Sequence, residues 1–96
     1  MLSKNGVPVR LTDERWAHIT EEHNELAGLR FEVLSVLSEP SETYQGSHEE
    51  LLATKELQEG LWLVVVYREY ELDGFVITAF LTSRKRYLER RVRLWP

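Results

Sequence analysis

Apolar residues recur along this chain with two periods, the first typical of helices and the second of strands. In residues 13–23, Trp16, Ile19 and His23 fall on one side of a helix that turns about 100° per residue. Thr12 precedes this segment, and its side-chain oxygen can accept a backbone N–H of the first turn. The pattern therefore predicts a first helix that follows Thr12 and ends at about His23.

A second helix is predicted over residues 29–38. Leu29, Val33 and Leu37 recur at the spacing of one helical face, which we expect to be buried. Pro40 follows and cannot continue a helix, because its ring clashes with the preceding turn and it lacks a backbone N–H. The first part of the chain is therefore expected to form two short helices.

From residue 41 onwards the pattern indicates extended structure. Runs of β-branched and aromatic residues predict four strands, at residues 43–45, 51–57, 61–70 and 75–83. Asp73 and Gly74 are expected to form a hairpin turn, and a weaker pattern at residues 92–95 allows a fifth strand. The order of elements predicts an α+β fold, with two N-terminal helices packed on a four-stranded or five-stranded antiparallel sheet.

The hairpin of residues 61–83 is expected to have one core face and one surface face. Pairing across a turn near Asp73 places even positions of one strand opposite odd positions of the other. The predicted core face holds Trp62, Val64, Val66, Arg68, Tyr70, Phe75, Ile77, Ala79 and Leu81. The other face holds Leu63, Val65, Tyr67, Glu69, Val76, Thr78, Phe80 and Thr82. The second face mixes hydroxyl groups with aromatic rings, so it could bind a ligand.

Composition limits the size and the chemistry of any site. With 96 residues, 43% of them hydrophobic and 29% charged, the chain is expected to form a single domain over residues 1–96 with a shallow groove as its site. The chain has no cysteine, which excludes disulfides, thiolate nucleophiles and cysteine-based zinc sites. The longest apolar run, residues 61–67, is too short to cross a bilayer, and residues 1–12 lack the apolar stretch of a signal peptide. We therefore expect a cytoplasmic protein without a membrane partner.

The charge is distributed unevenly along the chain. Residues 84–96 carry six Lys or Arg against one Glu, whereas residues 1–83 carry six against fifteen Asp or Glu. A basic segment of this kind can contact the phosphates of a nucleic acid, so a nucleic acid such as RNA is a candidate partner. The candidate nucleic-acid-binding residues are Arg84, Lys85, Arg86, Arg90, Arg91 and Arg93. The alternative is a solubilising, partly frayed C-terminal segment.

The histidines do not have the spacing of a metal site. His18 and His23 are five residues apart, which separates them by roughly 140° around a helix. His18 and Glu22 have a suitable spacing but supply only two ligands, so no metal or other cofactor is expected. Glycine-rich phosphate loops and a serine bracketed by glycines are also absent from the sequence.

The residue types required for metal-free RNA cleavage are present. Such cleavage needs a base for the 2′-hydroxyl, an acid for the leaving oxygen, and cations or donors around the phosphorus. His23 or His18 could act as acid or base. Candidate cations and donors are Lys55, Arg68, Arg84, Tyr67, Thr78, Thr82 and Ser83. The alternatives are a packed core histidine at position 23 and a solvent-facing His18 paired with Glu22 or Glu14.

Several segments together resemble a known bacterial family. They are LTDERWAHITEEHNEL, the region around SEPSETYQG, LWLVVVYRE and DGFVITAFLTSRKR, in that order between Leu11 and Arg86. The most specific parts are Trp16, His18, Ile19, His23, Glu25 and Leu26 in the first helix and Val76 to Ala79 in a strand. The chain is similar to the phage-associated nuclease-like domains of the barnase/EndoU/colicin/RelE superfamily.

The resemblance implies a fold and an activity. The implied fold has two N-terminal helices on a four-stranded antiparallel sheet, and the implied activity is metal-independent RNA cleavage by a toxin or phage-linked effector. His18 and His23 would be the first active-site matches, followed by Thr78, Thr82, Ser83 and the cations after them. A cognate antitoxin is a candidate partner of such a toxin. The alternative is a non-catalytic interaction module, which would pair through a sheet face, a sheet edge or the C-terminal residues 91–96 with another chain, such as a second copy.

Overall fold

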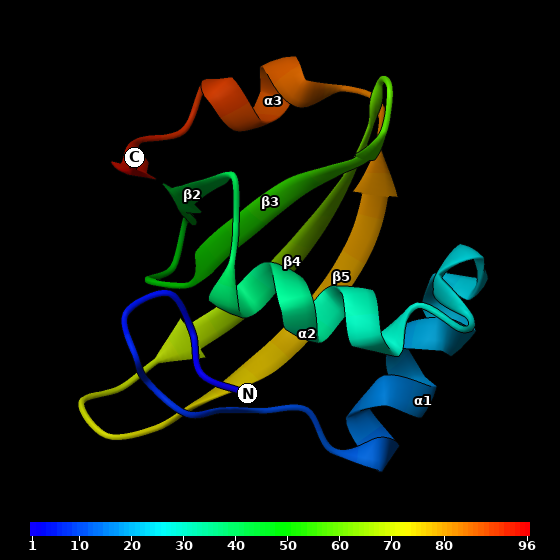
Figure 1. The fold of residues 1–96 in the computed structure, drawn as a ribbon, viewed down its shortest axis with the longest axis vertical. Helices are drawn as coiled ribbons and strands as arrows, with labels where there is room; N and C mark the ends of the chain where they lie inside the picture. Colours follow the sequence, from blue (N-terminus) through cyan, green and yellow to red (C-terminus); the bar gives the residue numbers. More distant parts are fainter.

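A single sheet of six strands forms the centre of the protein, and Figure 1 shows how the helices are arranged around it. The computed structural model describes all residues from Met1 to Pro96. The strands are β1 (Val9–Arg10), β2 (Glu42–Gln45), β3 (Leu51–Gln58), β4 (Leu61–Glu69), β5 (Gly74–Thr82) and β6 (Arg93–Trp95). They lie in the order β1-β5-β4-β3-β2-β6, with β1 parallel to β5 and every other pair antiparallel.

Two longer helices and one short helix accompany the sheet. They are α1 (Asp13–Glu22), α2 (Arg30–Ser38) and α3 (Lys85–Glu89), and a 3₁₀ turn, η1 (Asn24–Leu26), follows α1. The predicted cap of α1 is confirmed, because the backbone N–H of Arg15 donates to Thr12 Oγ1 at 3.1 Å. The predicted helices at residues 13–23 and 29–38 agree with α1 and α2 to within one residue at each end. No helix has the length and the apolar character needed to cross a lipid bilayer.

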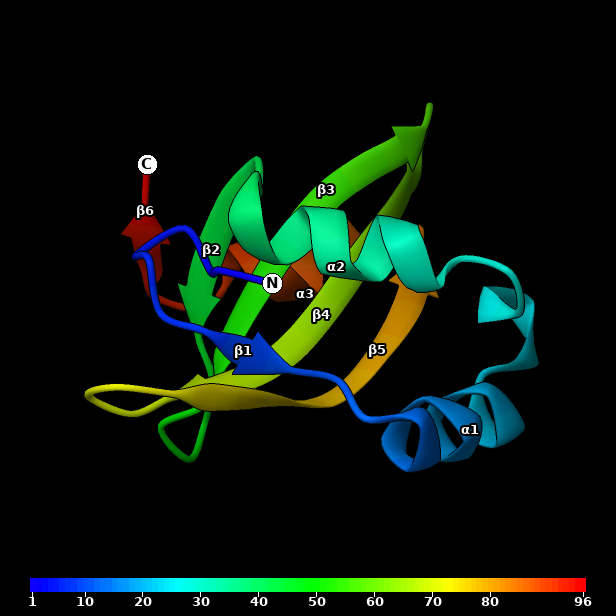
Figure 2. The same cartoon turned by 60° about the horizontal axis from the view of Figure 1, so that its bottom comes forward.

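The helices divide the two faces of the sheet between them. Figure 2 shows α2 in front of the sheet and α3 behind it, while α1 packs beside β5. The larger core cluster lies between α2, α1 and the sheet, and consists of Val9, Ile19, Leu26, Val33, Val36, Leu37, Ala53, Leu63, Val65, Tyr67, Val76 and Ala79. A smaller cluster of Tyr44, Leu52, Val64 and Leu88 lies under α3. The sheet is therefore covered by α2 on one face and only in part by α3 on the other.

The α+β class and the C-terminal strand are confirmed, but the fold differs in detail from the prediction. There are three α-helices instead of two, and the sheet has six strands and mixed pairing instead of four or five antiparallel strands. The missed elements, β1 and α3, have two and five residues, so they are too short to show a period in the sequence. The basic segment 84–96 is built into the fold as α3 and β6.

The predicted faces of β4 are also wrong, because a bulge changes the register of the hairpin. Trp62 lies opposite Thr82, an even position opposite an even one, and this parity holds as far as Val66 and Thr78. The register then shifts, and Tyr67 lies opposite Val76. The consequence is that Leu63, Val65 and Tyr67 face α2, whereas Trp62, Val64 and Val66 face the other way. In β5 the prediction is confirmed for Ala79 and Leu81 in the core and for Thr78, Phe80 and Thr82 on the other face. It is wrong for Val76, which lies in the core, and for Phe75, which lies on the other face opposite Arg68.

The β4–β5 turn lies one residue earlier than predicted. The backbone N–H of Tyr70 donates to the carbonyl of Asp73 at 2.6 Å, and Gly74 is already the first residue of β5. A Cβ atom at Gly74 would lie 2.2 Å from the carbonyl oxygen of Arg68. Glycine is therefore required here for the close approach of two strands, and not for the turn itself.

Candidate functional site: the open face of the sheet

The face of the sheet opposite α2 is only half covered, and we call it the open face. Under α3 its side chains are buried, as at Leu52 and Val64. Beyond α3 the side chains of β4 and β5 are half-buried, and they are Trp62, Val66, Arg68, Phe75, Thr78, Phe80 and Thr82. Cross-strand neighbours on this face pair an apolar side chain with a hydroxyl, as in Trp62 with Thr82 and Val66 with Thr78. The open face therefore offers both stacking surfaces and hydrogen-bonding groups.

His23 lies at one border of the open face. It is the C-cap residue of α1, and its ring centroid is 6.2 Å from that of Phe80. Its Nδ1 atom is 3.5 Å from Glu25 Oε1, and 31% of the side chain is exposed. His23 is therefore a border residue with access to solvent and not a fully packed core histidine.

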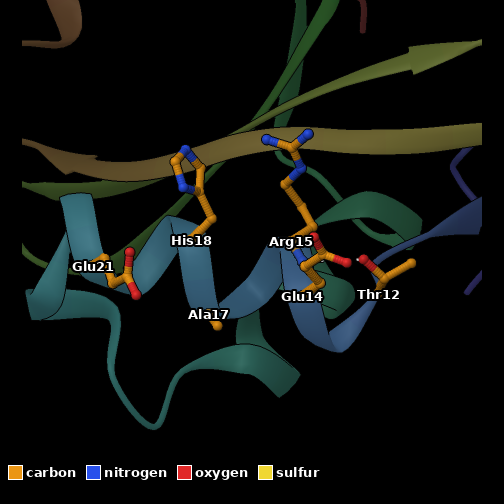
Figure 3. A pocket seen from close by; sticks show the side chains of 6 residues that line it. All are labelled: Thr12, Glu14, Arg15, Ala17, His18 and Glu21. Atoms are coloured by element: carbon orange, nitrogen blue, oxygen red, sulfur yellow. Dashed lines mark hydrogen bonds between the residues drawn. The ribbon is translucent and has the colours of Figure 1, made fainter.

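His18 is more exposed and is held by one carboxylate. Its Nε2 atom lies 2.6 Å from Glu22 Oε1, one helical turn further along α1, as the spacing predicted. This contact requires a hydrogen on Nε2, which leaves Nδ1 of a neutral ring as the proton acceptor. In Figure 3 the side chains of His18 and Arg15 project from the same side of α1, and Ala17 points away from them. A cavity of about 640 Å³ lies beside these residues.

Two of the six C-terminal cations are used to hold the C-terminal segment in place. Lys85 Nζ forms an ion pair with Glu42 Oε1, and Arg93 lies 3.5 Å from Glu42 Oε2. Burial opposes the ionisation of Glu42, but contacts with Lys85 and Tyr44 and the charge of Arg93 outweigh it, so the pKa of Glu42 is below its ordinary value. The contact with Glu42 raises the pKa of Lys85 despite its partial burial. Glu42 therefore fastens both α3 and β6 to β2.

The other four C-terminal cations make no ion pair. Arg84, Arg86, Arg90 and Arg91 are all exposed, and no carboxylate pairs with them. The guanidinium carbons of Arg84 and Arg90 lie 6.0 Å and 5.3 Å from the centre of the Tyr87 ring. Unpaired guanidinium groups that are held close together favour the binding of an anion, and phosphate suits their planar donors best.

The structure brings together some of the predicted catalytic residues and separates others. Thr78 and Thr82 lie on the open face, with His23 at its α1 border and Arg84 directly after β5. Arg68 also lies on this face, but its Nη2 donates to the carbonyl of His48 at 2.6 Å. Ser83 is exposed between β5 and α3.

Lys55 and Tyr67 do not reach the open face. Lys55 lies opposite Leu63 on the α2 side of the sheet. Tyr67 is 1% exposed within the core on that same side, where burial and then Glu69 raise the pKa of its hydroxyl. The predicted set therefore does not converge on one point, and neither side chain can contact a ligand on the open face.

Sequence reasoning missed three residues that border this site. Trp62 is a predicted core residue only because the predicted register is wrong. Arg15 lines a hollow together with Phe75, and no sequence pattern distinguishes it from other helix cations. Tyr87 had a usable signal, since it is the only aromatic residue within the basic run of residues 84–91. An aromatic ring between arginines is a combination that proteins use to bind single-stranded nucleic acid.

Comparison of the chain with protein families, with curated proteins and with solved structures gives no match.

Proposed function

We propose that this protein is a metal-independent endoribonuclease that binds RNA on the open face. The proposal rests on one observation above all: a half-exposed sheet face with aromatic and hydroxyl side chains lies between a histidine-bearing helix, α1, and an arginine-bearing helix, α3. Imidazole groups supply proton transfer near neutral pH, and guanidinium groups stabilise charge on phosphate oxygens. These are the groups that cleavage of RNA without a metal requires.

The proposed reaction uses the RNA's own 2′-hydroxyl as nucleophile. One imidazole takes the 2′-hydroxyl proton while the 2′-oxygen forms a bond to phosphorus, and the bond from phosphorus to the 5′-oxygen breaks. An acid protonates the leaving 5′-oxygen, so the products are a 2′,3′-cyclic phosphate and a free 5′-hydroxyl. His23 is the first candidate because it contacts Phe80 on the open face, and His18 is the second. An enzyme of toxin type would be held inactive by a cognate antitoxin.

The test is cleavage of a mixed single-stranded RNA by the purified chain in the presence of EDTA. We expect 2′,3′-cyclic phosphate ends, and a loss of about 10²–10⁴ in rate for the His23→Ala variant, which is the range for removal of a general acid or base. His18→Ala is measured in parallel. The matched control is His48→Ala, because His48 is exposed in the β2–β3 loop and the hydrogen bond of its side chain is with Ser47.

One observation favours the alternative, a non-catalytic module that pairs with a second copy of the chain. β6 is an edge strand, all three of its residues are exposed, and its outer side has no partner strand. Absence of cleavage by the wild-type chain at every concentration, together with a native mass twice that of the chain, would favour this alternative. Cleavage that persists unchanged in both the His23→Ala and His18→Ala variants would contradict the proposed mechanism.

A further inference from the structure

A distinct cavity lies on the open face between α3 and β5. Its volume is about 410 Å³, within the range of roughly 300–1,000 Å³ that is usual for small-molecule sites. The apolar floor is formed by Leu52, Phe80 and Leu88. Thr82, Arg84, Tyr87, Arg90 and Arg91 form the polar and charged part of the lining. The cavity thus combines an apolar floor with a cationic rim.

The aromatic residues give the cavity flat surfaces. Phe80 is half-buried in the floor, and Tyr87 at the rim is 58% exposed. The guanidinium groups that flank Tyr87 leave its ring accessible to solvent. Every nucleobase has a flat π-face, and stacking on an aromatic side chain contributes about 1–3 kcal/mol per base.

The rim of the cavity carries charge without a counter-charge. Arg84, Arg90 and Arg91 all line it, and none forms an ion pair within the protein. Thr82 Oγ1 accepts the backbone N–H of Arg84 at 3.0 Å, and the hydroxyl hydrogen of Thr82 has no acceptor in the protein. A phosphate of a ligand could pair with the arginines of the rim, and another acceptor oxygen of the same ligand could accept the hydroxyl hydrogen of Thr82.

We propose that this cavity binds one unpaired ribonucleotide of the substrate, with its base against Phe80 and Tyr87 and its phosphate at Arg90 and Arg91. This inference deepens the proposed ribonuclease function and rests on it. A base that is stacked within a duplex cannot enter a cavity of this kind, so the substrate class is single-stranded RNA. The cavity would fix the position of the chain relative to His23.

The test uses the full chain and four nucleoside 5′-monophosphates, with ribose 5-phosphate and inorganic phosphate as reference ligands, in calorimetric titrations. We expect the nucleotides to bind at least about tenfold more tightly than ribose 5-phosphate, because only they have a base that can stack. In the Tyr87→Leu variant this difference should shrink, while the affinity for inorganic phosphate stays the same.

The charged half of the cavity is tested by two variants that make the same change on the same segment. Arg91 lines the cavity, whereas Arg86 lies on α3 outside it. Arg91→Gln should weaken nucleotide binding about tenfold, the effect of losing a charge-assisted hydrogen bond, and Arg86→Gln should change it less than about twofold. Equal losses in the two variants would contradict a defined site, because they would indicate only a diffuse positive field.

The fate of this inference can be separated from that of the proposed function. Nucleotide binding with these variant effects, but without RNA cleavage, would support the cavity as a nucleotide site and contradict the proposed ribonuclease activity. RNA cleavage without any preference for nucleotides over ribose 5-phosphate would support the proposed ribonuclease activity and overturn the inference that the cavity binds a nucleotide.

Discussion

Adjacent residues of β4 and β3 have different access to a ligand because successive side chains of a strand point to opposite faces. Tyr67 is buried against α2, and its neighbour Arg68 lies on the open face. Lys55 lies on the α2 side of the sheet. Its neighbour Thr54 pairs with Val64, on the face of the sheet away from α2. A cation or a hydroxyl can therefore have the right chemistry for RNA cleavage and still be on the wrong face of the sheet.

Removal of Arg84 and removal of Lys55, which carry the same formal charge, should have different effects on the affinity for RNA. Arg84→Gln should weaken the affinity for a single-stranded, 2′-O-methylated RNA about five- to tenfold, because Arg84 lines the cavity on the open face. Lys55→Gln removes one charge from the other face and should change the affinity less than about twofold. Fluorescence anisotropy of a labelled RNA measures both. A larger effect of Lys55→Gln would place the RNA on the α2 side.

At the scale of elements, the position of α3 decides the shape of the candidate site. A helix of five residues has too few internal hydrogen bonds to persist alone, so contacts with the sheet must hold it. Leu88 anchors it in the small core cluster, and Lys85 anchors it to Glu42. Lys85 Nζ also lies 5.4 Å from the centre of the Trp62 ring. The same short helix carries Tyr87 to the rim of the cavity.

Removal of the Glu42 carboxylate should loosen this helix. Glu42→Gln should lower the free energy of unfolding at pH 7 by about 1.5–3 kcal/mol, the range for a hydrogen bond to a charged group, and should alter the fluorescence of Trp62. Glu59→Gln, an exposed change in the β3–β4 turn, is the matched control and should have no comparable effect. Denaturant unfolding measures both variants, and equal stabilities would contradict the anchoring role of Glu42.

The destabilisation should depend on pH at both ends of the range. The folded pKa of Glu42 is lowered, so its contribution is complete above its ordinary value of 4.5 and is lost as the pH falls through the folded value. The folded pKa of Lys85 is raised, so its contribution is complete below 10.5 and is lost as the pH rises through the folded value. The difference between wild type and Glu42→Gln should therefore be largest between these two values.

The sequence predicted the elements with strong local signals and missed those that depend on distant partners. Thr12 and Pro40 mark the limits of the helical region, and long β-branched runs mark β4 and β5. The faces of β4 could not be predicted, because a bulge near Val66 and Thr78 changes the register and no glycine or proline in the sequence indicates the bulge. α3 could not be predicted because its five residues show no period and because distant residues hold it, among them Glu42, which is 43 positions away from Lys85 in the chain.

At the scale of the whole molecule, the positive charge is concentrated in the C-terminal segment and the negative charge in the rest of the chain. The chain carries a formal net charge of −4 at pH 7, yet its last 13 residues hold half of the 12 Lys and Arg. The α3 segment places four unpaired arginines beside the open face. Residues 1–83 carry a net negative charge, which repels RNA, so under the proposed function we expect RNA to approach the protein at the arginine-bearing side of the open face.

The position of bound RNA on the protein is the most direct test of this account. A non-cleavable 2′-O-methylated RNA is added to the ¹⁵N-labelled chain, and the shifts of the backbone amide signals are recorded. We expect shifts at Thr78, Phe80, Thr82 and Arg84, at the end of α1 near His23, and at Tyr87. All of these shifts should be smaller in the Arg91→Gln variant. Shifts confined to α2, Lys55 or the β6 edge, or no shifts at all, would contradict the claim that the open face is an RNA site.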